Sequence, residues 1–140
     1  FARPGFRSLH NSSYWHETPY IGLGASAHSY LNGIRKWNIS NLKKYMDEIA
    51  CNKLPQEIEV LSKDTQYNDL ITTALRTKEG IDLNKMKNKY GEERYNYLMK
   101  EAQPHINAGK MELSKHHLFI TRMGLFTSDD IMSDLIYIAD

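Results

Sequence analysis

The sequence has 140 residues and contains little cysteine, which limits the chemistry that it can carry. Its single cysteine, Cys51, excludes a disulfide within one chain. It also excludes a metal or iron–sulfur site built only from cysteines of one copy. Proteins of reducing compartments make such sparing use of cysteine. We therefore expect a cytoplasmic protein.

The sequence also lacks long apolar runs and an excess of charge of either sign. No stretch approaches the roughly 20 apolar residues that a membrane-spanning helix requires, so no transmembrane segment is predicted. The chain has 18 basic and 17 acidic residues, which leaves a net charge of +1. Binding to nucleic acid relies on concentrated positive charge, so no nucleic-acid partner is expected.

The chain begins with Phe1 rather than methionine, and Arg3-Pro4-Gly5 follows almost at once. We interpret it as a fragment or processed piece whose partner sequence lies upstream. The 140 residues suffice for one ordinary domain with an appendage.

The first part of the chain is rich in glycine and aromatic residues and shows little helical periodicity. For residues 1–38 we expect irregular structure or contacts between copies of the chain. Apolar spacing predicts a short helix over residues 41–51, capped by Asn38, Ser40 or Asn41. Residues 52–57, which contain Pro55, should end that helix and form a linker.

Amphipathic segments dominate the second half of the chain. Apolar residues recur at helical spacing from Ser62 to Leu75 and again from Glu92 to Ala108. Between them, Asp82 should cap a brief helix that Gly91 closes. Pro104 should kink the third helix or end it early.

Strand-like alternation follows these helices. Residues 110–122 read as strand, turn and strand, with His116 and His117 in the turn and with inward side chains at Met111, Leu113, Leu118 and Ile120. A last helix should begin near Thr127. Three helices, a hairpin and a final helix are the order typical of a winged helix.

Several motifs occur in one register: Phe1–Gly5 (FARPG), His10–Trp15 (HNSSYW), Gly22–Ser29 (GLGASAHS), then Arg35 and Trp37-Asn38. With these motifs the sequence resembles the radical-SAM proteins related to oxygen-independent coproporphyrinogen III oxidase, and among them the haem-chaperone branch. Residues 70–83 (LITTALRTKEGIDL) are also similar. The resemblance covers most of the chain and is weakest after about residue 108.

The resemblance implies an α+β fold in three parts. Residues 1–38 would be the remnant of the last part of a radical-SAM (β/α) barrel, and residues 39–59 a connecting helix and linker. Residues 60–140 would form a mainly helical, winged-helix-like domain. The upstream barrel of the same protein is the implied partner, and a homo-oligomer is possible.

The resemblance also implies cofactors. The complete protein would hold a [4Fe–4S] cluster on three cysteines, and the cluster would bind S-adenosylmethionine. This chain has one cysteine, so it lacks the cluster ligands and should be inactive alone. In the chaperone branch the HNSSYW histidine is associated with haem, and this role carries over to His10 as a ligand of the haem iron.

The cofactor-binding residues that we predict are His10, Tyr14, Trp15, Gly22, Gly24, Ala25 and His28. Tyr14 and Trp15 offer flat apolar surfaces to a porphyrin, and the loop at Gly22 would lie near S-adenosylmethionine. The alternative for each is packing: a hydrogen-bonded histidine, aromatic rings on the end of the barrel, and glycines that let a strand approach backbone.

The function that this reading favours is haem binding and transfer by a haem chaperone. One alternative is part of an oxygen-independent coproporphyrinogen III dehydrogenase in haem biosynthesis. Another, of a different class, is a winged-helix module that binds nucleic acid.

Overall fold

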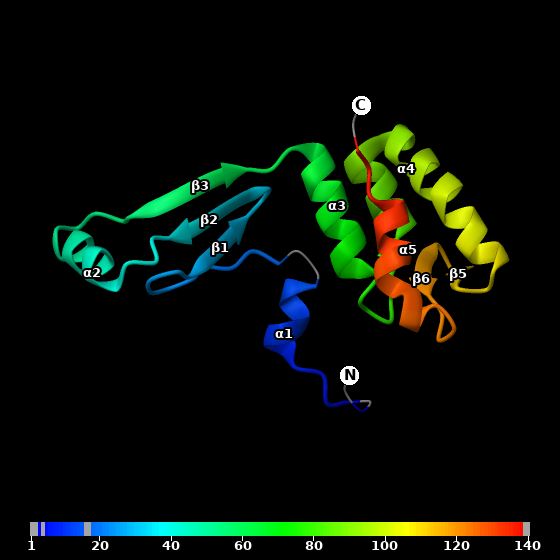
Figure 1. Ribbon diagram of the computed structural model, residues 1–140, viewed down its shortest axis with the longest axis horizontal. Helices are drawn as coiled ribbons and strands as arrows, with labels where there is room; N and C mark the ends of the chain where they lie inside the picture. Colours follow the sequence, from blue (N-terminus) through cyan, green and yellow to red (C-terminus); the bar gives the residue numbers. More distant parts are fainter. Residues whose placement is uncertain (1–2, 4, 16–17, 139–140) are drawn as a thin grey trace. The chain divides into compact units, whose positions relative to one another are not determined.

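The computed structural model describes residues 3, 5–15 and 18–138, and it shows a mixed α+β fold (Figure 1). The chain divides into two compact units. Residues 1–16 and 63–140 form one, which we call the helical unit, and residues 17–62 form the other, the small sheet unit. Phe1, which we expected to contact other copies of the chain, lies outside the described residues.

The helical unit combines helices with a small antiparallel sheet. Its sheet has three strands in the order β4-β6-β5. The elements after residue 62 are α3 (Lys63–Ala74), β4 (Ile81–Asp82), α4 (Leu83–Asn107), β5 (Met111–Ser114), β6 (His117–Ile120), η1 (Leu125–Thr127) and α5 (Ser128–Leu135).

The core of the helical unit is formed by the apolar faces that the periodicity predicts. Fully buried side chains come from α3, α4, the sheet and α5, and they include Tyr67, Ile71, Leu98, Leu118 and Leu135. Burial of large apolar side chains is the main stabilising term in such a unit. The prediction that Leu113 points inward is wrong, because Leu113 is 46% exposed. Met111 is the one buried residue of β5.

The helix boundaries around α4 follow local chemistry. Asp82 caps the helix, as predicted, by accepting hydrogen bonds from the backbone N–H groups of Asn84 and Lys85. Gly91 has φ 90° and separates two helical segments. The early end predicted at Pro104 is wrong, because α4 continues to Asn107. Proline removes only its own N–H from the helix, and its carbonyl still accepts from the N–H of Ala108.

The small sheet unit is a three-stranded antiparallel sheet with one helix. Its strands β1 (His28–Leu31), β2 (Ile34–Asn38) and β3 (Gln56–Val60) lie in that order, and α2 (Leu42–Ala50) connects β2 to β3. Asn41 caps α2 through the N–H of Lys44, which confirms one of the predicted caps.

Two expectations for this region are wrong. Residues 28–38 are a regular hairpin rather than irregular chain, because Asn32 and Gly33 adopt φ 47° and 80° in a two-residue turn that matches strand twist. The linker expected at residues 52–57 ends earlier, since β3 begins at Gln56 and pairs with β2. The second hairpin also differs slightly: His116 lies in its turn, but His117 is the first residue of β6.

Candidate functional site

The glycine-containing loop before β1 is held by the side chain of Asn38. Asn38 is 2% exposed, and its Nδ2 donates to the carbonyl oxygens of Gly24 at 2.7 Å and Gly22 at 3.4 Å. Its Oδ1 accepts from Nε2 of Gln56 at 3.0 Å. Both ends of the amide are therefore satisfied, so the end of β2 fixes the loop that the sequence predicted as a binding element.

Gly22 is required by close backbone packing. A Cβ at this position would lie 2.2 Å from the carbonyl oxygen of His28, so no other residue fits without a shift of the chain. The N–H of Gly22 donates to Oγ of the buried Ser29 at 3.0 Å. The N–H of Gly24, which has φ 102°, donates to the hydroxyl of Tyr45 at 3.3 Å. These contacts match the packing alternative, in which glycine permits a strand to approach backbone.

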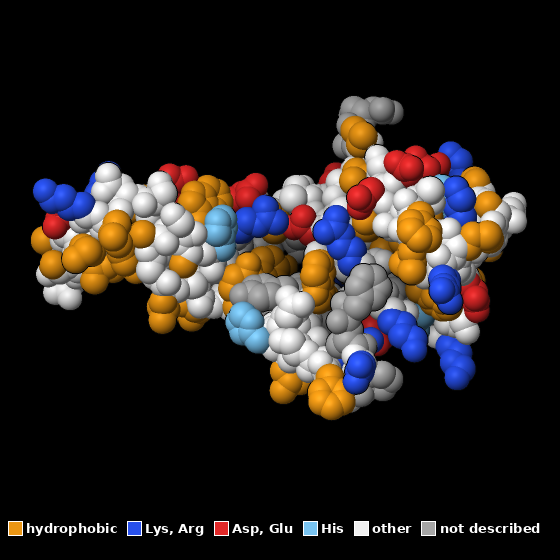
Figure 2. Space-filling model, turned by 60° about the horizontal axis from the view of Figure 1, so that its bottom comes forward, with side chains coloured by type: hydrophobic (Ala, Val, Ile, Leu, Met, Phe, Trp, Pro, Cys, Tyr) orange, Lys and Arg blue, Asp and Glu red, His pale blue; other side chains and the backbone are white. Residues whose placement is uncertain are grey.

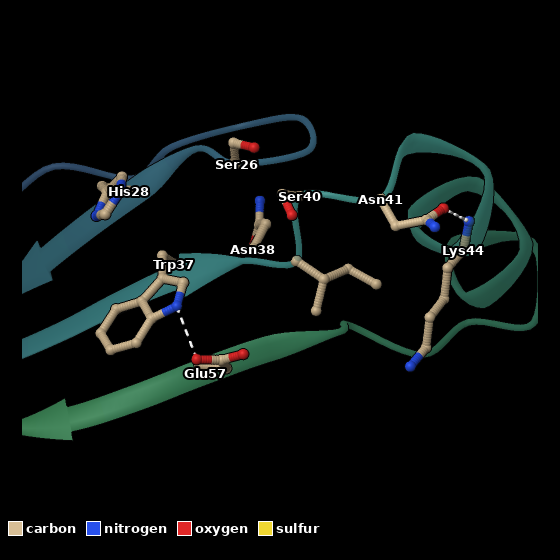
Figure 3. Close-up of a pocket in the computed structure, with 9 residues that line it drawn as sticks. Ser26, His28, Trp37, Asn38, Ser40, Asn41, Lys44 and Glu57 are labelled. Atoms are coloured by element: carbon tan, nitrogen blue, oxygen red, sulfur yellow. Dashed lines mark hydrogen bonds between the residues drawn. The ribbon is translucent and has the colours of Figure 1, made fainter.

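A row of three polar and aromatic side chains crosses the sheet beside this loop. His28 of β1, Trp37 of β2 and Glu57 of β3 are neighbours in the strand register (Figure 3). The rings of His28 and Trp37 lie 6.1 Å apart with a tilt of 30°. The indole Nε1 of Trp37 donates to Oε2 of Glu57 at 2.9 Å, which fixes the plane of the indole.

This row borders an open pocket of about 440 Å³ within the small sheet unit. Its lining is Ser26, His28, Trp37, Asn38, Ile39, Ser40, Asn41, Lys44 and Glu57. The pocket therefore offers an aromatic surface, an imidazole, a carboxylate and an ammonium group. Such a set suits a ligand with a flat ring and charges of both signs.

His10, Tyr14 and Trp15 lie in the helical unit, on or next to α1 (Leu9–Tyr14). The HNSSYW stretch lies in the region expected to be irregular, but most of it belongs to this short helix, which Ser8 caps by accepting from the N–H of Asn11 at 3.2 Å. His10 is exposed and Trp15 is partly buried. The side chain of Tyr14 lies outside what the structure describes.

The predicted residues thus fall into two groups. His10 and Trp15 belong to the helical unit, whereas Gly22, Gly24 and His28 belong to the small sheet unit together with Ala25. Asn38 and Trp37 belong to a motif of the resemblance but were not among the predicted site residues. Asn38 holds the loop, and Trp37 lines the pocket. The Asn32-Gly33 pair between two strand-like runs was the sequence signal that would have revealed the hairpin.

Two of the basic residues near these motifs have acidic partners. Arg7 forms an ion pair with Glu79 at 2.7 Å, and Arg35 forms one with Glu59 at 3.4 Å. Among the described residues, no cluster of three histidine, cysteine or acidic side chains is arranged to hold a metal ion. No helix within the described ranges is long and apolar enough to cross a membrane.

Comparison with known proteins finds similarity to HemN and HemW proteins. Residues 61–127 match the HemN C-terminal domain. The chain is 40% identical to the heme chaperone HemW of Lactococcus lactis over 90 residues, which is 64% of this chain and 24% of that protein. It is 26% identical to HemW of Bacillus subtilis over 132 residues, which is 94% of this chain and 35% of that protein. The chain is therefore similar to HemW proteins, and its residues 61–127 are similar to the HemN C-terminal domain.

The fold of the chain also has a solved counterpart. HemN of Escherichia coli, a coproporphyrinogen III oxidase and radical SAM enzyme, superposes with a TM-score of 0.67 and 17% identity. The match covers 97% of this chain and 35% of that chain, and at this identity it speaks for the fold alone. Relative to the two HemW proteins, the chain spans between about a quarter and a third of their length.

Proposed function

We propose that this chain is part of a haem chaperone and that it binds haem for transfer to another protein. The observation that carries the proposal is its identity to proteins named heme chaperone HemW, at 40% and 26%. The coproporphyrinogen oxidase matches at only 17% identity, so the oxidase alternative has weaker support. The near-neutral charge likewise gives little support to a nucleic-acid module. The single cysteine supports a cytoplasmic location.

His10 is the residue that we propose as the ligand of haem iron. Neutral imidazole is a common axial ligand in haem proteins. His10 is exposed on α1, so an incoming porphyrin reaches it without unfolding the core. Trp15 follows at the end of the same helix and supplies apolar surface for the macrocycle.

The pocket beside His28 and Trp37 is the part of the chain that we propose to face S-adenosylmethionine in the complete protein. A flat ring of the ligand would pack on the indole of Trp37. The carboxylate of Glu57 and the ammonium group of Lys44 would pair with ligand groups of opposite charge. The residues present do not fit a [4Fe–4S] cluster, because Cys51 is the chain's single cysteine and lies exposed at the end of α2. The cluster ligands must come from elsewhere in the complete protein.

Exposed apolar side chains support the upstream barrel as a partner of the small sheet unit. Hydrophobic side chains gather at the surface on the left of Figure 2, over this unit. None of the residues of α2 is buried, although its apolar residues share one face. Outside β3, the large exposed side chains of the unit are Ile21, Leu23, Leu31, Leu42, Met46, Ile49 and Leu54. A homo-oligomer is the alternative that would cover them.

The structure also supports a winged-helix-like description of the C-terminal domain. Along the chain, α3 and β4 are followed by the two helical segments of α4 and then by the hairpin of β5 and β6. Because β4 pairs with β6, this hairpin lies next to the helical core. In this chain we propose that the domain docks against the rest of the protein, because fold alone does not specify nucleic-acid binding.

A haem titration tests the proposed ligand. Ferric haem added to the 140-residue chain should give a saturable shift of the Soret band, and His10→Ala should abolish the shift because the axial imidazole is gone. His116→Ala, which removes an exposed histidine from the β5–β6 turn, is the matched control and should bind as the wild type does. An unchanged titration of His10→Ala would refute the assignment.

A further inference from the structure

The outer edge of β3 is a row of backbone groups available for another strand. β3 is at one end of the sheet order β1-β2-β3. The N–H of Leu61 donates to the carbonyl of Gly33, and the N–H of Ile39 donates to that of Pro55. In the antiparallel register these bonds place Glu57 and Glu59 at hydrogen-bonded positions toward β2. The N–H and C=O groups of Ile58 and Val60 therefore point to the open side.

This edge has few of the features that protect natural sheet edges. Native proteins cover edge strands or place charged residues (above all lysine), proline or bulges on them. Of these features, β3 carries the charges of Glu57 and Glu59. Here Ile58 is 61% exposed and Val60 is 77% exposed, and the strand pairs with β2 without a break over all five residues. Such a strand is a template for addition of a further strand.

The two faces of β3 specify the chemistry of the added strand. Side chains alternate between faces, so Glu57 and Glu59 share one face while Ile58 and Val60 share the other. Glu57 accepts from Trp37 and Glu59 pairs with Arg35, but a carboxylate has about four acceptor positions, so both can take a further cation. A strand that alternates basic with apolar residues matches both faces.

Two other candidates for the strand that pairs with the β3 edge fit less well: β3 of a second copy, and the part of the chain that precedes β1. A second copy adding its own β3 in antiparallel fashion around Ile58 would place Glu57 opposite Glu59, and like charges directly opposite are destabilising. The preceding chain approaches the sheet from the other edge, where Tyr20 exchanges two backbone hydrogen bonds of 3.0 Å with Tyr30 of β1. The β3 edge is thus left for a different molecule.

We propose that β3 binds, by strand addition, an extended segment of a separate protein in which lysine or arginine alternates with apolar residues. The main chain of the segment pairs with Ile58 and Val60. Its cations lie beside Glu57 and Glu59. This inference concerns the outer edge of β3. Glu57 also lines the pocket proposed to face S-adenosylmethionine, but strand addition at this edge does not require that ligand or haem.

Fluorescence anisotropy with two labelled seven-residue peptides tests the proposal on the 140-residue chain. A peptide alternating lysine with valine should bind saturably, and a peptide alternating glutamate with valine should bind about tenfold more weakly. The double substitution Glu57→Lys with Glu59→Lys should reverse this order. Absence of saturable binding, or equal binding of the two peptides, would overturn the proposal.

A proline substitution tests the main-chain pairing. Val60→Pro removes an outward N–H without breaking a bond to β2, so the affinity for the lysine peptide should fall about tenfold. Val60→Ala keeps the N–H and is the matched control, and circular dichroism should show the same folded content for both variants. Equal affinities of the two variants would contradict strand addition.

The source of the segment is tested by lengthening the chain and by measuring its oligomeric state. The chain extended by its complete upstream sequence should bind the lysine peptide as the 140-residue chain does. If the extension abolishes binding, a strand of the same polypeptide covers the edge and the assignment to a separate protein fails. A dimer in sedimentation that Val60→Pro dissolves would assign the edge to a second copy instead.

Discussion

Asn38 shows how one buried amide can organise a binding loop. Its donor end holds the carbonyls of Gly22 and Gly24, and its acceptor end receives Gln56 from β3. Three segments that are distant in sequence therefore meet at one side chain. The loop that borders the pocket is therefore held to the sheet, and its own turn is closed by the N–H of Ala27, which donates to the carbonyl of Gly24 at 3.3 Å.

Replacing Asn38 by alanine should destabilise the small sheet unit. The amide of Gln56 would lose its bond to Asn38, and the carbonyl of Gly24 would lose its 2.7 Å bond and keep the 3.3 Å bond from Ala27. Because Asn38 is 2% exposed, the loss should cost about 1–3 kcal/mol. Urea unfolding followed by Trp37 fluorescence, in a Trp15→Phe background, measures this loss. Ser40→Ala changes an exposed neighbour and should leave the midpoint unchanged. Equal midpoints for Asn38→Ala and the control would contradict this role.

At the scale of elements, the two hairpins and α4 illustrate which local signals were sufficient. Asp82 and Gly91 marked the start and the interruption of α4 because capping and positive φ are properties of single residues. Asn32-Gly33 carried an equally local hairpin signal that the sequence reading did not use. In β3 the run Glu57 to Val60 alternates polar and apolar residues as strands do, but it is short and exposed, so pairing with β2 is what defines it as a strand.

The cap of α4 should make stability depend on pH. The backbone N–H of Lys85 donates to the carboxylate of Asp82 and lowers the pKa of Asp82 in the folded chain. A lowered pKa gives stabilisation that is present above the unfolded value of about 3.9 and is lost as pH falls through the folded value. Asp82→Ala should therefore cost about 1 kcal/mol at neutral pH and less in acid.

Circular dichroism during urea unfolding at neutral and acid pH measures this difference. Asp82→Asn is the informative companion variant, because asparagine caps helices about as well but does not titrate. It should match the wild type at neutral pH and keep its cap in acid. A difference between Asp82→Ala and the wild type that is the same at both pH values would show that ionisation of Asp82 is irrelevant.

At the scale of the whole molecule, the end of the chain closes the helical unit. The side-chain amide of Asn68 exchanges hydrogen bonds of 2.9 and 2.8 Å with the backbone of Tyr137. The hydroxyl of Tyr67 donates to the carbonyl of Leu135, and that of Tyr97 donates to the carbonyl of Ile136. Arg94, paired with Asp64, lies 3.6 Å from the centre of the Tyr137 ring. The tail thus ties α3 to α4.

Asn68→Ala should loosen this closure. Both polar groups of the Tyr137 backbone would lose their partner, which costs about 1–3 kcal/mol and lowers Tm by about 4–8 °C for each kcal/mol in a domain of this size. Thermal unfolding followed by circular dichroism measures the shift. Asn96→Ala, at an exposed position of α4, is the control and should not lower Tm. A tail that contributes nothing would give Asn68→Ala the same Tm as this control.

The sequence by itself determined the helices of the C-terminal half, the start and the interruption of α4 and the motifs of the resemblance, because periodicity, caps and glycine act within a few neighbouring residues. Only the tertiary structure decided that Asn38 holds the loop at Gly22 and that His28, Trp37 and Glu57 form a row. It also decided that Asn68 forms hydrogen bonds with the backbone of Tyr137. These contacts join residues far apart in the chain. Their partners are selected by strand register and core packing, which no short stretch of sequence contains.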